Sequence, residues 1–154
     1  MRFEMMEAAV ESRFLFAMRF IQAPGEADIE VRCRDIDWLL TWGKTVVEAR
    51  QNALDALEVC IAGHMREQKP IPVASKARRG EIMVGMGPIM TAKAALYEAM
   101  REAGMSNVAL GKKLGVAETE VRRLLSPRHN SKIERLDKAL AVFGRHIVVQ
   151  IAAE

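Results

Sequence analysis

The sequence predicts an α+β protein in which a small antiparallel sheet with one long helix precedes an all-α region that ends in a short strand. Short apolar runs before residue 44, bounded by turn residues, predict strands. A single amphipathic stripe follows, and beyond residue 90 the apolar spacing becomes helical. Half of the 154 residues are hydrophobic and 28% are charged, which excludes a disordered tail or a fibrous repeat. We expect two domains, residues 13–88 and 89–154.

Two strands are predicted at the start of the first domain. Residues 14–21, FLFAMRFI, are mostly large and apolar and end at the turn Ala23-Pro24-Gly25. Residues 28–34 alternate between charged and apolar side chains, as in an antiparallel strand with one buried face. The apolar positions of this second strand are Ile29, Val31 and Cys33.

A third apolar run, residues 38–42, ends at Gly43 and predicts another strand. Trp38 and Trp42 are four positions apart, so we expect them on one face of it. Burial of both beneath the next helix is the simpler interpretation. The alternative is that one of them lies at a partner-binding edge, where tryptophan often dominates the binding energy.

A long helix is predicted from the Thr45–Glu48 capping box to about Glu67. Its apolar stripe comprises Val46, Ala49, Ala53, Leu57, Cys60 and Ile61. Prolines 70 and 72 then exclude a helix, so residues 69–80 form a linker or a crossing loop. Alternation at residues 82–86 predicts a fourth strand that returns to the sheet and ends at Gly87-Pro88.

Four short helices are predicted in the second domain, at residues 91–103, 106–114, 117–125 and 132–143. Glycines 104, 115 and 144 close three of them, and a capping box at Ser131–Glu134 begins the last. Residues 147–151 alternate again and predict a terminal strand whose partner the sequence leaves open.

The second and third of these helices have the spacing of a helix-turn-helix. Gly111 is small where the helices must approach closely, and Gly115 forms the turn. A helix of this kind fits the DNA major groove, where arginine binds guanine and lysine binds phosphate. The simpler alternative is the solvated face of an ordinary helical bundle. Our candidate DNA-binding residues are Asn107, Lys112, Lys113, Thr119, Glu120, Arg122, Arg123, Arg128, His129 and Lys132.

The charge distribution favours the same interpretation. Residues 1–90 hold 12 basic and 13 acidic side chains, a net charge of −1, whereas residues 91–154 hold 11 and 7, a net charge of +4. No apolar run is long enough for a membrane span or a signal peptide, so we expect a cytoplasmic protein without membrane contact. Cys33, Cys60 and the scattered histidines lack metal-ligand spacing, so no metal or other cofactor is expected.

Residues 95–151, including VRRLLSPRH after the recognition helix, resemble the C-terminal helix-turn-helix domain of HicB-type antitoxins. The EAxxxAxxAL pattern from Glu48 and the KPIPVAS segment extend the resemblance to residues 18–152. Three features depart from the family pattern. Asp37-Trp38 replaces a proline turn, Ala117 replaces a capping Ser or Asp, and residues 1–17 precede the usual start, as an extension or an upstream start codon. Glu118 and Glu120 lie beside the candidate DNA-binding residues. There they either accept a hydrogen bond from cytosine or repel DNA that is bound in a wrong register.

The resemblance implies an N-terminal domain similar to a truncated ribonuclease H fold, which binds a HicA-like, mRNA-cleaving toxin. It also implies a C-terminal domain that binds double-stranded operator DNA and represses the operon, as a homodimer or a higher even oligomer. The alternative is a stand-alone transcriptional regulator whose first domain oligomerises or senses a ligand. A residual nuclease using Asp28, Glu30, Asp35, Asp37 and Glu48 is a third hypothesis, but charges on the polar face of a strand are ordinary, so we expect no enzyme activity.

Overall fold

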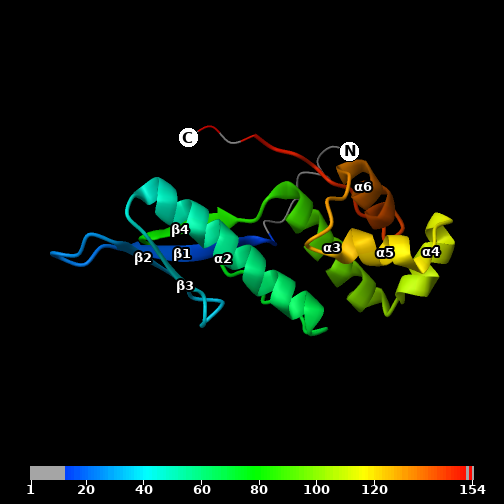
Figure 1. Ribbon diagram of the computed structural model, residues 1–154, viewed down its shortest axis with the longest axis horizontal. Coiled ribbons are helices and arrows are strands. Elements are labelled where there is room, and N and C mark those ends of the chain that lie inside the picture. The colour runs from blue at the N-terminus through cyan, green and yellow to red at the C-terminus, as the bar shows by residue number, and fades with distance from the viewer. Residues whose placement is uncertain (1–12, 152, 154) are drawn as a thin grey trace.

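The computed structural model describes residues 13–151 and 153, and it confirms the α+β class (Figure 1). A four-stranded sheet with the order β3-β2-β1-β4 is antiparallel throughout. We call residues 13–87 the α+β half and residues 88–151 the helical half. The elements are β1 (Leu15–Ile21), β2 (Ile29–Cys33), β3 (Leu40–Gly43), α2 (Val46–Arg66), β4 (Glu81–Gly85), α3 (Pro88–Ala103), α4 (Asn107–Leu114), α5 (Glu118–Leu125) and α6 (Ile133–Ala141).

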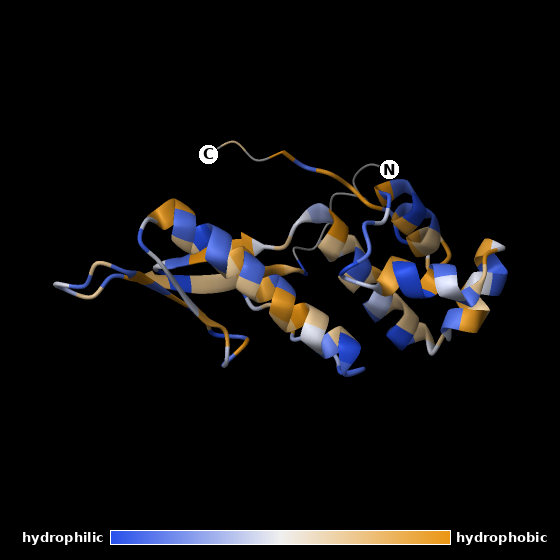
Figure 2. Ribbon diagram, in the orientation of Figure 1, coloured by the Kyte–Doolittle hydropathy of each residue, from blue (hydrophilic) through white to orange (hydrophobic). Residues whose placement is uncertain are grey.

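One face of the sheet packs against α2 and forms the first hydrophobic core. Phe16, Met18 and Val31 on this face are fully buried, and so are Ala53 and Leu57 of α2. Apolar and polar residues alternate along α2 (Figure 2), as the sequence predicts. The predicted stripe is wrong only at its first member, since Val46 is 55% exposed. The buried stripe begins one turn later, at Ala49, because that residue is the first to reach the sheet.

The start of α2 is fixed by its cap and by contact with β3. Thr45 Oγ1 accepts a hydrogen bond from Glu48 N at 3.1 Å, as the capping box predicts. The return bond differs from the prediction, because the Glu48 carboxylate accepts from Lys44 N at 2.8 Å instead. Gly43 lies so close to α2 that a Cβ built there would be 2.3 Å from Ala49 N. A glycine is therefore required where β3 meets the helix.

Both cysteines belong to this first core, as predicted. Cys33 and Cys60 are buried and form no disulfide. Burial raises the pKa of the Cys60 thiol to about 11 and raises the pKa of Cys33 as well. Both thiols are therefore protonated at neutral pH and act as small apolar side chains.

Trp38 and Trp42 are not buried, so the favoured prediction for them is wrong. Trp38 is 60% exposed and Trp42 is 49% exposed. Trp38 precedes β3, in a turn closed by the bond from Leu39 N to Ile36 O. The two-residue period of a strand therefore does not apply to Trp38, and Ile36 and Leu39 fill the core in its place.

Residues 69–80 form a crossing loop that is anchored to the rest of the protein. Arg34 donates to Ser75 Oγ at 2.6 Å, and Ser75 N donates to the Asp35 carboxylate at 2.8 Å. At the other end, Tyr97 Oη donates to Lys69 O at 2.7 Å. These bonds attach the loop both to the end of β2 and to α3.

The Arg34–Glu81 ion pair predicts an acid-sensitive α+β half. Its atoms are 2.9 Å apart, and the hydrogen bond from Arg34 lowers the pKa of Glu81 to about 2. The pair therefore stabilises the fold above about pH 4.5, and this contribution is lost as the pH falls towards 2. The free energy of unfolding, measured with urea at pH 7 and pH 3, should depend less on pH for Glu81→Gln than for the wild type. An equal dependence would show that the pair does not stabilise the fold.

The helical half has its own core, and α3 contributes to both. Ala92, Leu96 and Met100 pack with residues of α4, α5 and α6, whereas other residues of α3 pack on the first core. The latter are Met90, Ala94 and Tyr97. Glycines 104, 115 and 144 have φ values of 60°, 69° and 69°, which confirms their helix-ending positions.

Two predictions for the helical half are wrong. Residues 147–151 form no strand, because no described strand lies alongside to supply a ladder (red segment in Figure 1). The predicted Ser131–Glu134 capping box is also absent. Lys132 is the N-cap of α6 and makes no side-chain cap bond, because the Ser131 hydroxyl points inward and accepts from Lys93 Nζ at 2.7 Å.

Candidate nucleic-acid interface

The turn between α4 and α5 brings these two short helices into close contact. Ser106 Oγ caps α4 by accepting from Ala109 N at 3.1 Å, and Gly115 ends that helix in the left-handed conformation. At Gly111 a built Cβ would be 2.8 Å from Val116 O. The structure thus confirms the close approach that the small residue predicts.

The packing of α5 determines which of its side chains are exposed. Val121 and Leu124 are buried in the second core. The predicted DNA-binding residues Thr119, Arg122 and Arg123 lie on the exposed surface. This short helix therefore presents two arginines to solvent from a backbone that is fixed on its inner side.

Two glutamates hold these arginines in place. Glu118 binds Arg122 at 2.8 Å, whereas Glu120 binds Arg123 at 2.6 Å and Arg135 of α6 at 2.9 Å. The hydrogen bond from Arg135, followed by the charge of Arg123, lowers the pKa of Glu120. The glutamates thus contact arginines. The i,i+4 spacing of Glu118 and Arg122 and the i,i+3 spacing of Glu120 and Arg123 were the available signal in the sequence.

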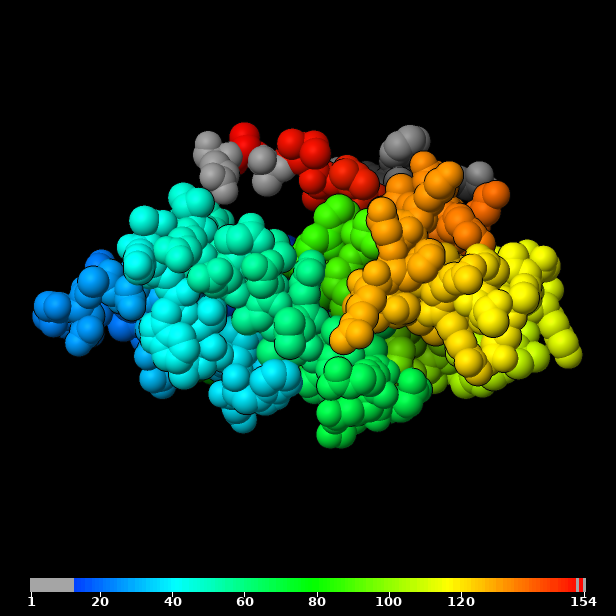
Figure 3. All heavy atoms as spheres, viewed as in Figure 1, coloured from blue at the N-terminus to red at the C-terminus, as the bar shows by residue number. Residues whose placement is uncertain are grey.

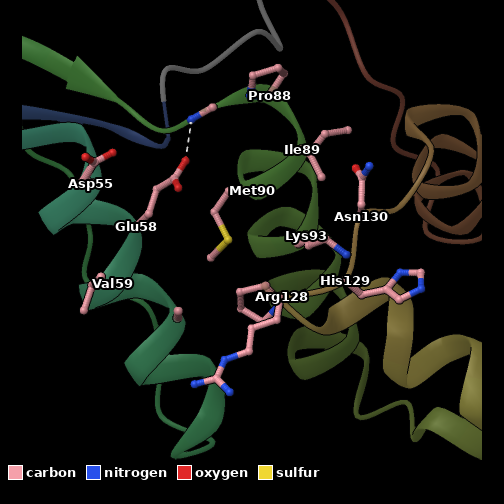
Figure 4. Close-up of a pocket in the computed structure, with 13 residues that line it drawn as sticks. Asp55, Glu58, Val59, Pro88, Ile89, Met90, Lys93, Arg128, His129 and Asn130 are labelled. Carbon is pink, nitrogen blue, oxygen red and sulfur yellow. Dashed lines mark hydrogen bonds between the residues drawn. The ribbon is translucent and has the colours of Figure 1, made fainter. Parts of the chain in front are cut away.

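The other candidate residues are distributed over three places. Asn107 begins α4, Lys112 and Lys113 are exposed in its last turn, and Lys132 precedes α6. Arg128 and His129 lie beyond α5 and line a groove that faces α2, and Arg128 extends towards that helix (Figure 4). These two residues therefore face the groove, in the segment that directly follows α5.

The groove lies between the two halves and has a volume of about 580 Å³. One wall is α2, with Asp55, Glu58 and Val59, and the other is α3 and the segment 127–130 (Figures 3 and 4). Glu58 accepts a hydrogen bond from Gly87 N at 2.9 Å. This bond attaches the middle of α2 to the start of α3.

Lys93 is a residue of this region that the sequence reasoning missed. It is 1% exposed, and its ammonium group donates to Arg123 O at 3.1 Å, Leu124 O at 2.9 Å and Ser131 Oγ. Burial lowers its pKa to about 8. A cation at the last carbonyls of α5 holds the end of that helix against α3. The available signal was a single lysine within the apolar, alanine-rich stretch of α3.

The N-terminus of α5 lacks a side-chain cap, as its sequence predicts. Ala117 is the N-cap and makes no side-chain bond. Ala117→Ser should supply an acceptor and stabilise the protein by about 1 kcal/mol. Denaturant unfolding would measure the change. An unchanged midpoint would mean that the free N–H groups of α5 are already satisfied in solution.

Three of the five carboxylates proposed for a nuclease bind separate partners. Asp35 binds Ser75, Glu30 binds Arg32, and Glu48 binds the backbone at the start of α2. Within the described ranges, no three His, Cys, Asp or Glu side chains are placed to hold a metal ion. None of the described helices is long and apolar enough to cross a membrane.

The fold and the site define a two-part protein with an α+β half and a helical half that exposes basic side chains. The chain belongs to the HicB family of antitoxins: residues 18–95 match the family described as HicB-like antitoxins of bacterial toxin-antitoxin systems. It is 30% identical to Antitoxin HicB of Pseudomonas fluorescens over 91% of this chain and 95% of that protein. It is 33% identical to Antitoxin HicB 2 of Photorhabdus laumondii over 73% and 80%, and 26% identical to Antitoxin HicB of Escherichia coli K12 over 73% and 82%.

Proposed function

We propose that this antitoxin neutralises a HicA-like, mRNA-cleaving toxin by direct binding and represses its own operon by binding operator DNA. The family match carries the proposal, because it covers the α+β half and because the relatives named as antitoxins match most of the chain. In this proposal the α+β half binds the toxin and the helical half binds DNA. No enzyme activity is needed for either task.

The exposed surface of α5 supports the DNA-binding part of the proposal. A helix with Arg122 and Arg123 on its outer face suits the major groove, where a guanidinium group binds guanine. Lys112 and Lys113 of α4 then contact phosphates, as in a helix-turn-helix protein. Such proteins read paired half-sites, so a homodimer or a higher even oligomer is part of the proposal.

The alternative is a stand-alone regulator without a toxin, and one experiment separates the two. The tagged chain is co-expressed with a neighbouring reading frame of about 60–80 residues, the size of one small domain. Stable co-purification and rescue of growth support the antitoxin. If the neighbouring product neither binds nor inhibits growth, while the chain still binds its upstream DNA, the regulator is correct.

The proposed assignment of toxin binding to the α+β half predicts where a toxin-binding fragment must end. We propose the α+β half as the toxin-binding domain, yet α3 adds Met90, Ala94 and Tyr97 to its core. A fragment of residues 13–104 should therefore unfold at a clearly higher urea concentration than one of residues 13–87, because truncation at residue 87 exposes this surface. Equal midpoints would show that α3 does not stabilise the first core.

A further inference from the structure

An exposed tryptophan beside α2 is held in a defined position. The Trp38 ring stacks on His64 of α2, with centroids 6.2 Å apart and planes 17° apart. His64 Nδ1 is in turn hydrogen-bonded to Cys60 O at 2.9 Å. One ring face is thus supported while 60% of the residue stays exposed. An ordered aromatic side chain binds a partner at a small cost in conformational entropy.

The surface next to Trp38 is hollowed and partly apolar. A depression of about 370 Å³ is lined by Trp38, Asn52 and Ala56, and also by Asp55 and Val59. Val59 is 68% exposed although it is a large apolar residue in the middle of α2. The turn that precedes β3 lies beside α2 at this place (Figures 1 and 3). We call Trp38, Asp55 and Val59 the Trp38 face.

This face also carries negative charge. Asp55 accepts a hydrogen bond from Gln51 Nε2 at 3.0 Å, and Asp37 is exposed next to Trp38. Among the described residues, no cation forms an ion pair with either carboxylate. A lysine or arginine of a partner would therefore meet an acceptor that no positive charge of the described chain already occupies.

The other exposed tryptophan lies in a different electrostatic setting. Trp42 is paired with Glu30 on the sheet face opposite α2, and Leu40 of the same strand is paired with Arg32. Arg32 is in turn paired with Arg19 of β1. On this face Glu30 forms an ion pair with Arg32, and Glu81 lies opposite Arg19. These charges already compensate one another, so this face offers a positively charged partner less than Asp55 does.

We propose that the Trp38 face is the toxin-docking surface of this antitoxin, and that a positively charged protein occupies it. The inference rests on the proposed function, which supplies the toxin partner. The positive charge of that partner is inferred from the carboxylates of Asp37 and Asp55, with which no cation of the described residues forms an ion pair. In the complex an apolar side chain of the toxin enters the hollow beside Trp38 and Val59. A basic side chain of the toxin binds Asp55, and Trp38 supplies the largest single contribution to binding.

Paired variants of the full-length chain test this surface against the other tryptophan. Trp38→Ala should weaken toxin binding about 30-fold in titration calorimetry, which corresponds to about 2 kcal/mol. Trp42→Ala, with a similar exposure on the opposite sheet face, should bind like the wild type. Circular dichroism checks that both variants fold. Toxin binding that is unchanged by Trp38→Ala, or weakened equally by both, overturns the proposal.

Charge reversal tests the electrostatic part independently. Asp55→Lys should weaken toxin binding at least 10-fold, whereas Glu26→Lys, an exposed reversal in the β1–β2 turn, should have little effect. If wild-type antitoxin binds no toxin, the proposed function itself fails. If the wild type binds and Asp55→Lys binds equally well, only the docking surface is wrong. If Trp38→Ala changes the sedimentation of the free antitoxin but not its toxin affinity, a second copy of this chain is the occupant.

Discussion

Replacing Arg122 and Arg123 together by alanine should weaken operator binding at least 30-fold and leave toxin neutralisation intact. Each arginine that binds a base contributes about 1–3 kcal/mol, and two such losses add when the contacts are independent. The variant also leaves Glu118 and Glu120 without the arginines of α5 that they bind. Glu120 keeps its ion pair with Arg135, but Glu118 is left uncompensated, and a free carboxylate next to phosphates adds repulsion to the lost contacts.

A mobility-shift titration at fixed salt measures this effect. Arg145→Ala is the matched control, since Arg145 is another exposed arginine of the helical half and pairs with Glu102 rather than with α5. The control should bind operator DNA nearly as well as the wild type. Equal affinities of the double variant and the wild type would reject α5 as the DNA-reading element.

Gly43→Ala should destabilise the α+β half by about 3 kcal/mol. Neutralisation of the toxin should then be lost near the upper temperature limit of growth. The new Cβ would meet the backbone of Ala49 at 2.3–2.5 Å, so β3 and α2 must separate. Gly63→Ala is the control, because a Cβ built at Gly63, inside α2, meets no atom within 4 Å other than its chain neighbours and the adjacent turns of helix backbone. Thermal unfolding should show a lower midpoint for the first variant and an equal or higher one for the second. A wild-type midpoint for Gly43→Ala would contradict the close approach.

The parts of the fold that were predictable depend on local patterns. Alternation located β2 with its buried residues, and turn residues located the ends of β1 and β4. The threonine of the first capping box and the glycines after the helices located the helix ends to within about three residues. These signals act within a few residues of the chain, so the sequence contains them directly.

The wrong predictions involve competition between a local pattern and a distant group. Ser131 has the spacing of a cap, but the buried ammonium of Lys93, 38 positions away, binds its hydroxyl. Residues 147–151 alternate like a strand, yet alternation alone supplies no ladder partner. Trp38 lies in a turn, although the apolar run of residues 38–42 predicts a strand there. Each outcome depends on which residues meet in space, and periodicity does not encode that.

The candidate DNA-binding site was predictable to a similar degree. Amphipathic spacing placed Arg122 and Arg123 on the exposed side of α5, and Gly111 predicted the contact between α4 and α5. Helical spacing allows the ion pairs Glu118–Arg122 and Glu120–Arg123 to be predicted. The pair Glu120–Arg135 and the position of Arg128 in the groove facing α2 depend on the tertiary structure. Whether each of the ten candidates contacts DNA stays a prediction.

Inhibition of the partner toxin in a purified system tests the central claim most directly. The toxin is mixed with a labelled RNA, and wild-type antitoxin is added in increasing amounts at concentrations well above the dissociation constant. We predict that RNA cleavage falls linearly and stops at a fixed stoichiometric ratio, as direct binding requires. Cleavage that continues in the presence of excess folded antitoxin would contradict neutralisation by direct binding.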